Sequence, residues 1–202
     1  VFEAEGSSVV ITGSHTLPNV TFTNQQSAAR TITISGGTTL SVSGTTTFDN
    51  TSTGTMTLNT GGLTVLGDVN VETAGNYAGT TVLNFGGSGT QTFDLTGAET
   101  IMDMDITVNK AGGQVNLGSA LTMNANNQDL TIQEGTFDVA GYALTVNGTG
   151  STFTVESGGN LQLQGTEPPT TPTFNVGSSV TYDGSSTYTG LSMGDSYVNP
   201  DL

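Results

Sequence analysis

Few side chains in this sequence could catalyse a reaction or hold a metal ion. Asp103 and Asp105 stand two residues apart, so on one strand both carboxylates would point to the same side. Paired carboxylates act as general acid and base in enzymes that cleave glycosidic bonds. Because apolar residues alternate with the two aspartates over 101–106, we expect ordinary aspartates on the solvent face of a strand.

Calcium is the metal ion that these carboxylates suit best, because it takes oxygen ligands from acidic side chains and turn carbonyls. Asp103 and Asp105 are therefore the candidate ligands, and no other cofactor is expected. The sequence has neither an Asp-x-Asp-x-Asp-Gly loop nor a Gly-Gly-x-Gly-x-Asp repeat. Further acidic residues near the starts of the long repeats described below are Glu3, Glu5, Asp183, Asp195 and Asp201.

β-Helix enzymes that cleave pectin and other glycans also have a basic residue or a histidine close to their carboxylates. His15 is the only histidine, and Arg30 and Lys110 are the only strong cations. These three residues fall in separate parts of the sequence, so we predict that the protein is not an enzyme. A β-helix enzyme that degrades polysaccharides is the least favoured alternative, and it would require His15 and the aspartates to meet in a cleft.

Charge and composition exclude several classes of partner. The net charge of −15 leaves no basic surface to neutralise phosphates, which excludes nucleic acids and disfavours anionic membranes. The chain has no cysteine, and no apolar run approaches the roughly 18 residues of a membrane span. Apolar residues make up only 33% of the 202 residues, so a thick central core is not expected.

The elements that would position these side chains are short strands. Between 121 and 163, two apolar residues repeatedly flank a small polar one, as in Leu144-Thr145-Val146, and a Gly or Asn turn follows. This period of two predicts strands, and no helical stripe is present. The triads in this stretch begin at Leu121, Leu130, Phe137, Leu144, Phe153 and Leu161.

Three such triads would form one coil of roughly 20–25 residues, the length of one turn of a parallel β-solenoid with three sheets. The sequence therefore predicts an all-β fold, a right-handed parallel β-helix of about nine or ten coils. Residues 1–202 would form a single solenoid domain or a segment of a longer one. The proline-containing segment 165–172 would bulge from one corner as a loop.

A longer repeat overlies the short one. The aromatic residues Phe2, Phe85 and Tyr182 each precede a Gly- or Ser-containing stretch, and each is followed about twenty residues later by a similar strand. Large repeats would therefore start near 1, 83 and 180, and each complete one would hold about four coils.

The segment from Thr107 to Leu163 resembles repeats of large bacterial and archaeal surface and adhesin-like β-helix proteins. The phrase that carries the resemblance is Gly135-Thr-Phe-Asp-Val-Ala-Gly-Tyr-Ala-Leu-Thr-Val146. The resemblance implies a right-handed parallel β-helix at the cell surface or outside the cell. It implies no catalytic residues.

The predicted function is that of an extracellular structural protein, a fibre subunit that associates end to end with copies of itself. No capping segment is expected at either end, and an uncapped coil presents unpaired strand groups to another strand. The predicted contact residues are Val1, Phe2, Val9, Val10, Ile11, Val198, Asn199, Pro200, Asp201 and Leu202.

The main alternative is an adhesive or glycan-binding stalk within a surface adhesin. It would be favoured if the five tyrosines gathered on one exposed face: Tyr77, Tyr142, Tyr182, Tyr188 and Tyr197.

Ice binding is a further alternative, because Thr-x-Thr segments occur within 45–47, 53–57 and 90–92. A flat ice-binding face needs such pairs in register on every coil. Their spacing is irregular here, so these threonines are expected only to cover strands.

Overall fold

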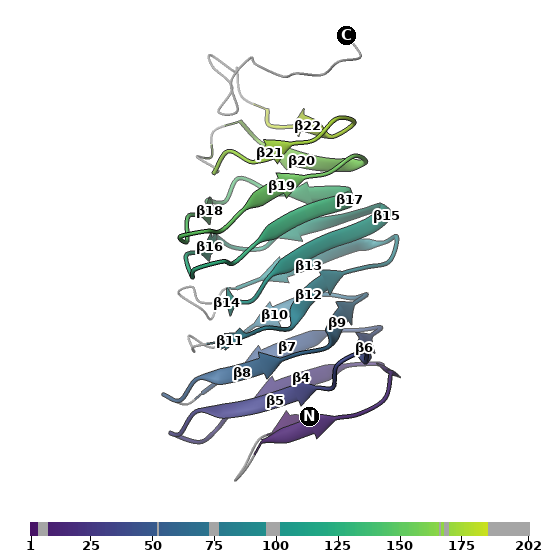
Figure 1. The fold of residues 1–202 in the computed structure, drawn as a ribbon. Helices are drawn as coiled ribbons and strands as arrows, with labels where there is room; N and C mark the ends of the chain where they lie inside the picture. The colour runs from purple at the N-terminus through teal and green to yellow at the C-terminus, as the bar shows by residue number, and fades with distance from the viewer. Residues whose placement is uncertain are drawn as a thin grey trace.

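The computed structural model describes residues 1–3, 8–51, 53–72, 77–95, 102–165, 167 and 170–185. Within these ranges there are strands and no helix. The paired strands run parallel and wind into a β-solenoid of about seven turns, stacked as a rod in Figure 1. The prediction of an all-β parallel solenoid is confirmed.

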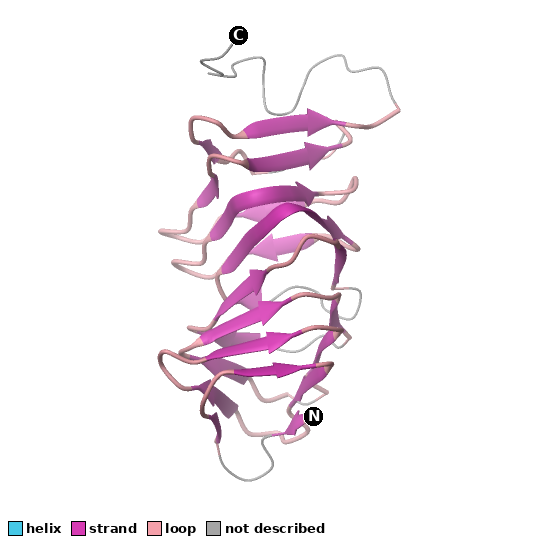
Figure 2. Ribbon diagram, turned by 90° about the vertical axis from the view of Figure 1, so that its right-hand side faces the viewer, coloured by secondary structure: helices cyan, strands magenta, loops and turns pink. Residues whose placement is uncertain are grey.

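Successive turns contribute strands to three faces of the rod (Figures 1 and 2), except that beyond Val146 the described strands lie on two of these faces only. Face 1 contains β1 (Phe2–Glu3), β4 (Val20–Thr23), β7 (Thr46–Asp49), β10 (Val69–Val71), β13 (Thr90–Asp94), β20 (Gly159–Leu163) and β22 (Ser179–Tyr182). Face 2 contains β3 (His15–Leu17), β6 (Thr39–Val42), β9 (Gly62–Val65), β12 (Val82–Phe85), β19 (Phe153–Val155) and β21 (Thr173–Phe174). Face 3 contains β2 (Val9–Ile11), β5 (Arg30–Ile34), β8 (Met56–Asn59), β11 (Tyr77–Gly79), β14 (Met102–Asp103), β16 (Leu121–Met123) and β18 (Leu144–Val146).

Two long strands belong to two faces at once. The first parts of β15 (Ile106–Leu117) and β17 (Leu130–Asp138) pair on face 2, and their last parts pair on face 1. They pass the corner at Gly112 and Gly135, whose φ angles of 69° and 84° suit glycine best. Faces 1 and 2 are thereby joined into one sheet of 15 strands.

Coil length varies around the predicted value. Phe22 pairs with Phe48, 26 residues further on, whereas Leu161 pairs with Val180, only 19 residues further on. The strands keep their register because the extra residues lie in the corners, which Figure 2 shows as loops projecting from the stack.

The core is a continuous stack of the two apolar residues of each triad. In Leu144–Val146 the first and last side chains are buried in the core, and Thr145 between them is half-buried and faces outward. The rings of Phe2, Phe22 and Phe48 stack along face 1, with centroids 5.7 and 5.4 Å apart. Fully burying one such ring contributes roughly 1.5–3 kcal/mol, so the thin core gains stability from repetition.

The aromatic residues of the long repeat do not occupy equivalent positions. Phe2 and Tyr182 lie on face 1, in β1 and β22, whereas Phe85 lies on face 2, in β12. The described residues of the predicted loop 165–172 lie against the solenoid: Glu167 is buried, and the Thr170 N–H donates to the Leu144 carbonyl oxygen of β18 at 2.9 Å. The strands resume with β21.

Face 2 carries an unbroken outward column of small polar residues. The pairing aligns one such residue from every coil: Thr16, Ser41, Thr64, Asn84, Thr107, Thr131, Thr154 and Thr173. The adjacent column contains Thr39, Gly62 and Val82. The paired threonine rows that ice binding would require are therefore not formed there.

Candidate functional site

The strand ladder of face 3 has a gap in its middle. β14 pairs with β11, and β16 pairs with β18, but within the described ranges no pairing joins β14 to β16. β14 is only two residues long, and the chain bends at Met104 directly after it. A strand this short offers little backbone for the next coil to pair with.

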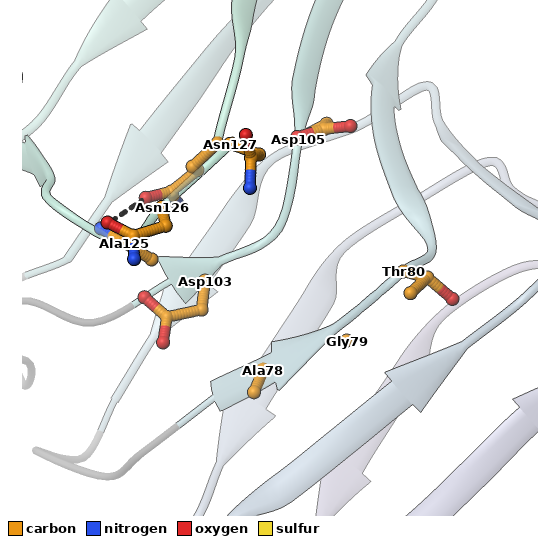
Figure 3. A pocket seen from close by; sticks show the side chains of 9 residues that line it. Ala78, Gly79, Thr80, Asp103, Asp105, Ala125, Asn126 and Asn127 are labelled. Carbon is orange, nitrogen blue, oxygen red and sulfur yellow. Dashed lines mark hydrogen bonds between the residues drawn. The ribbon is translucent and has the colours of Figure 1, made fainter. Parts of the chain in front are cut away.

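A hollow of about 520 Å³ lies beside this gap (Figure 3). Three successive turns line it: the turn of β11, the turn of β14 and the turn of β16. The lining residues are Ala78, Gly79, Thr80, Asp103, Asp105, Ala125, Asn126, Asn127 and Gln128.

The prediction that Asp103 and Asp105 share one strand is wrong. Asp103 ends β14, Met104 turns its side chain into the core, and Asp105 precedes β15. In Figure 3 the side chains of Asp103 and Asp105 lie apart and point in different directions. The corner between faces 3 and 2 therefore separates them, and they do not form a catalytic pair.

The two aspartates also differ in their surroundings. Asp105 Oδ1 accepts a hydrogen bond from the Asp129 N–H at 3.0 Å, so Asp105 ties its own coil to the next one. Asp129 repeats this role one coil later, because its Oδ1 accepts the Thr152 N–H at 2.7 Å. Asp103 is half-buried and has no hydrogen bond to any described residue, and burial raises the pKa of its carboxyl above 3.8.

The opposite wall of the hollow is a corner rich in side-chain amides. Gln128 is buried, and it holds the corner by donating from Nε2 to the Met104 carbonyl oxygen at 3.2 Å. Asn126 Oδ1 accepts the Thr149 N–H at 3.3 Å, which leaves the Asn126 amide hydrogens for another acceptor. Asn127 has a φ of 56°, a conformation that asparagine tolerates better than most residues. The amide-rich sequence over 124–128 indicated a turn, but nothing in it indicated that Asp103 lies opposite.

The predicted calcium ligands remain two divergent carboxylates. Across the described ranges, no group of three or more His, Cys, Asp or Glu side chains is placed to hold a metal ion. Glu3 lies in the first turn and Asp183 follows β22, far from the hollow along the rod. Glu5, Asp195 and Asp201 fall outside the described residues.

The basic residues do not meet the aspartates. His15 in β3 is four ladder steps from Ile106, about 19 Å at the usual strand spacing. Arg30 lies in β5, one turn from the N-terminal end. Lys110 is fully buried where β15 turns the corner, and its Nζ donates to the Gly86 carbonyl oxygen at 2.8 Å and to Gln91 Oε1.

The three tyrosines within the described ranges do not gather on one exposed face. Tyr77 is buried, and its hydroxyl accepts the Asn50 N–H at 2.9 Å. Tyr142 is 41% exposed, and Tyr182 is partly buried against the core. Tyr188 and Tyr197 fall outside the described residues.

Some of the predicted assembly residues of the first coil face the core, and others face the solvent. Phe2 and Val9 point inward and are partly buried against the core, and Ile11 is buried. Val1 and Val10 are exposed, at 86% and 58%. The second predicted set, 198–202, falls outside the described residues.

No protein family, curated protein or solved structure matches the chain. No helix in the described part of the chain is long and apolar enough to cross a membrane.

Proposed function

We propose that this protein is an extracellular structural protein, a β-solenoid that forms part of a surface fibre and associates end to end. One observation carries the proposal. In the first described turn, β1, β2 and β3 each have a paired strand on one side only. Ile11 of that turn is buried, but other inward side chains, including Phe2 and Val9, are only partly buried.

Such an edge accepts a further coil for two physical reasons. The unpaired N–H and C=O groups of three parallel strands can continue their ladders with another strand, as in β-strand addition. The Phe2 ring would at the same time gain a neighbour on its free side, as Phe22 has in Phe48. The added coil could come from a second copy or from another segment of the same polypeptide.

The proposal includes a right-handed winding and nine or ten coils in the whole chain. Support for the winding comes from sterics, since crossovers between neighbouring parallel strands are right-handed in about 98% of cases. Support for the number of coils comes from face 1, whose ladder continues through β20 and β22 beyond the last three-stranded turn. The surface location rests on the resemblance of the 107–163 segment to surface β-helix repeats.

Electron microscopy of the purified chain tests end-to-end association. We expect rods much longer than one chain, and we expect Val9→Lys to shorten them, because Val9 points into the stack at the open edge. Val10→Lys is the matched control, since it adds the same charge on the outside of the same strand. Wild-type rods of single-chain length at every concentration, or equal shortening by both variants, would refute the proposal.

A further inference from the structure

The hollow beside the gap in face 3 has the size of a small-molecule site. Its volume of about 520 Å³ falls within the roughly 300–1,000 Å³ of ligand pockets. It is walled by side chains from three successive turns, so a ligand there would contact residues some 45 positions apart in sequence, from Thr80 to Asn126. In this solenoid the hollow lies where the ladder of face 3 is interrupted between β14 and β16.

The polar groups at the hollow are of two complementary kinds. The Asp103 carboxylate accepts hydrogen bonds, is half-buried, and has no donor among the described residues. The Asn126 amide donates from its nitrogen, because its oxygen is already occupied by the Thr149 N–H. A ligand that satisfies both groups must donate to a carboxylate and accept from an amide. A hydroxyl group does both.

Charge and shape narrow the ligand further. The protein carries a net charge of −15, and two carboxylates lie at the hollow, so anionic ligands are disfavoured. A bare metal ion is also disfavoured, because the two carboxylates diverge and Asp105 is occupied by the Asp129 N–H. Ala78, Gly79 and Ala125 also line the hollow and add apolar surface to it, which suits the C–H surface of a sugar ring.

We propose that this hollow binds a neutral saccharide unit, with Asp103 accepting from its hydroxyls and Asn126 donating to them. None of the described residues that line the hollow is aromatic, and stacking on a ring would have contributed much of the affinity. The expected affinity is therefore millimolar for a disaccharide, and tight attachment would require many copies along a fibre. The site lies on the side of the rod and does not depend on end-to-end association.

Nuclear magnetic resonance on the ¹⁵N-labelled full chain tests the site, with cellobiose, maltose and N,N′-diacetylchitobiose as probes. At least one probe is expected to give saturable shifts at the side-chain amides of Asn126 and Asn127 and at the backbone of 78–80. Asp103→Ala and Asn126→Asp should each weaken binding tenfold or more. Asp103→Ala should still fold, because it removes no hydrogen bond to a described residue.

Asp49→Ala is the control, since it removes a half-exposed carboxylate on face 1. It should leave the shifts unchanged. Shifts that are absent with all three probes, or that persist in Asp103→Ala, would overturn the proposal. Shifts at the same amides with calcium chloride and not with the sugars would also overturn it and assign the hollow to a cation. Fibre formation is measured separately by microscopy, so neither result stands in for the other.

Discussion

At the scale of single residues, Lys110 is a basic side chain that the solenoid buries and hydrogen-bonds. Its side chain has no solvent exposure, and its Nζ is held by the Gly86 carbonyl oxygen and Gln91 Oε1. Ile106 and Val108 point inward before it, so the period of two continues through Lys110 and predicts an inward side chain. Sequence alone could not show that the chain would turn a corner there and supply oxygen atoms to the ammonium.

Replacing Lys110 should change how stability depends on pH. Burial lowers the pKa of Lys110 from 10.5 in the folded state. Between that lowered pKa and 10.5, Lys110 is protonated in the unfolded chain and largely neutral in the folded one. The free energy of unfolding of the wild type should therefore rise as pH increases through that interval. Lys110→Met should abolish this rise and cost about 1–3 kcal/mol at neutral pH, because two buried acceptors lose their donor.

Urea unfolding at a series of pH values measures both effects of the Lys110 change. Lys110→Ala is the companion variant, which removes the same donor and also leaves a cavity, so its loss should be larger. A rise of the same size in Lys110→Met and wild type would contradict this account.

Asp138 should change the stability of the fold with pH in the opposite direction to Lys110. Burial raises its pKa above 3.8, and the nearby Asp183 and Glu167 add to this, although the Ala140 N–H and Gln114 counteract it. The folded state therefore holds the proton more firmly, and stability should fall as pH rises through the interval above 3.8.

Asp138→Asn should remove the contribution of Asp138 to the fall in stability above pH 3.8. Carboxyl chemical shifts followed by nuclear magnetic resonance would report the Asp138 titration directly. A midpoint at or below 3.8 would contradict the predicted direction.

At the scale of elements, the triads predict strands well and corners poorly. The triads over 121–123, 144–146 and 153–155 coincide with β16, β18 and β19. By contrast, the triad that begins at Leu130 and the first two residues of the triad that begins at Phe137 belong to the single strand β17. Gly135 lets the chain turn the corner there without leaving the sheet. The period of two depends only on neighbouring residues in the sequence. Whether a strand bends or ends at a corner depends also on contacts with the next coil.

The column of threonines on face 2 shows the same limit. Thr107, Thr131 and Thr154 align on neighbouring strands, although the number of residues per coil varies along the chain. The irregular spacing of Thr in the sequence hides this register, since the additional residues lie in corners. The hollow could not be predicted either, because it depends on the missing pairing between β14 and β16.

Close stacking of coils should make some corner glycines irreplaceable. A Cβ on Gly79 would lie 1.6 Å from the Leu58 carbonyl oxygen, and the φ of Gly79 is 139°. Because backbone would have to move, Gly79→Ala should cost at least about 3 kcal/mol. A Cβ on Gly89 would meet nothing within 4 Å, so Gly89→Ala should change stability by less than about 0.5 kcal/mol. Thermal unfolding of the two variants measures the contrast, and equal losses would contradict the packing described for the corner of β11.

At the scale of the whole molecule, the rod combines a strongly acidic charge with a first turn whose strands each pair with one described strand only. The interior is apolar and aromatic from Phe2 to Phe48 and beyond, and the acidic side chains lie mainly on the outside. Each coil contacts only its neighbours, so added coils contribute similar increments of stability. Whether two rods join is decided by the gain at one new coil interface against the repulsion of two charges of −15.

This balance predicts that salt promotes assembly. Repulsion between two exposed like-charged rods is screened over a Debye length of about 10 Å at 0.1 M salt, whereas the ladder and apolar contacts at the joint are hardly weakened. The mean rod length from small-angle X-ray scattering should therefore increase between low and moderate ionic strength. Val10→Lys should follow the wild type, and Val9→Lys should stay short at every ionic strength, because its ammonium would be buried at the joint. Rods that shorten as salt is added would mean that ion pairs, and not coil stacking, hold the ends together.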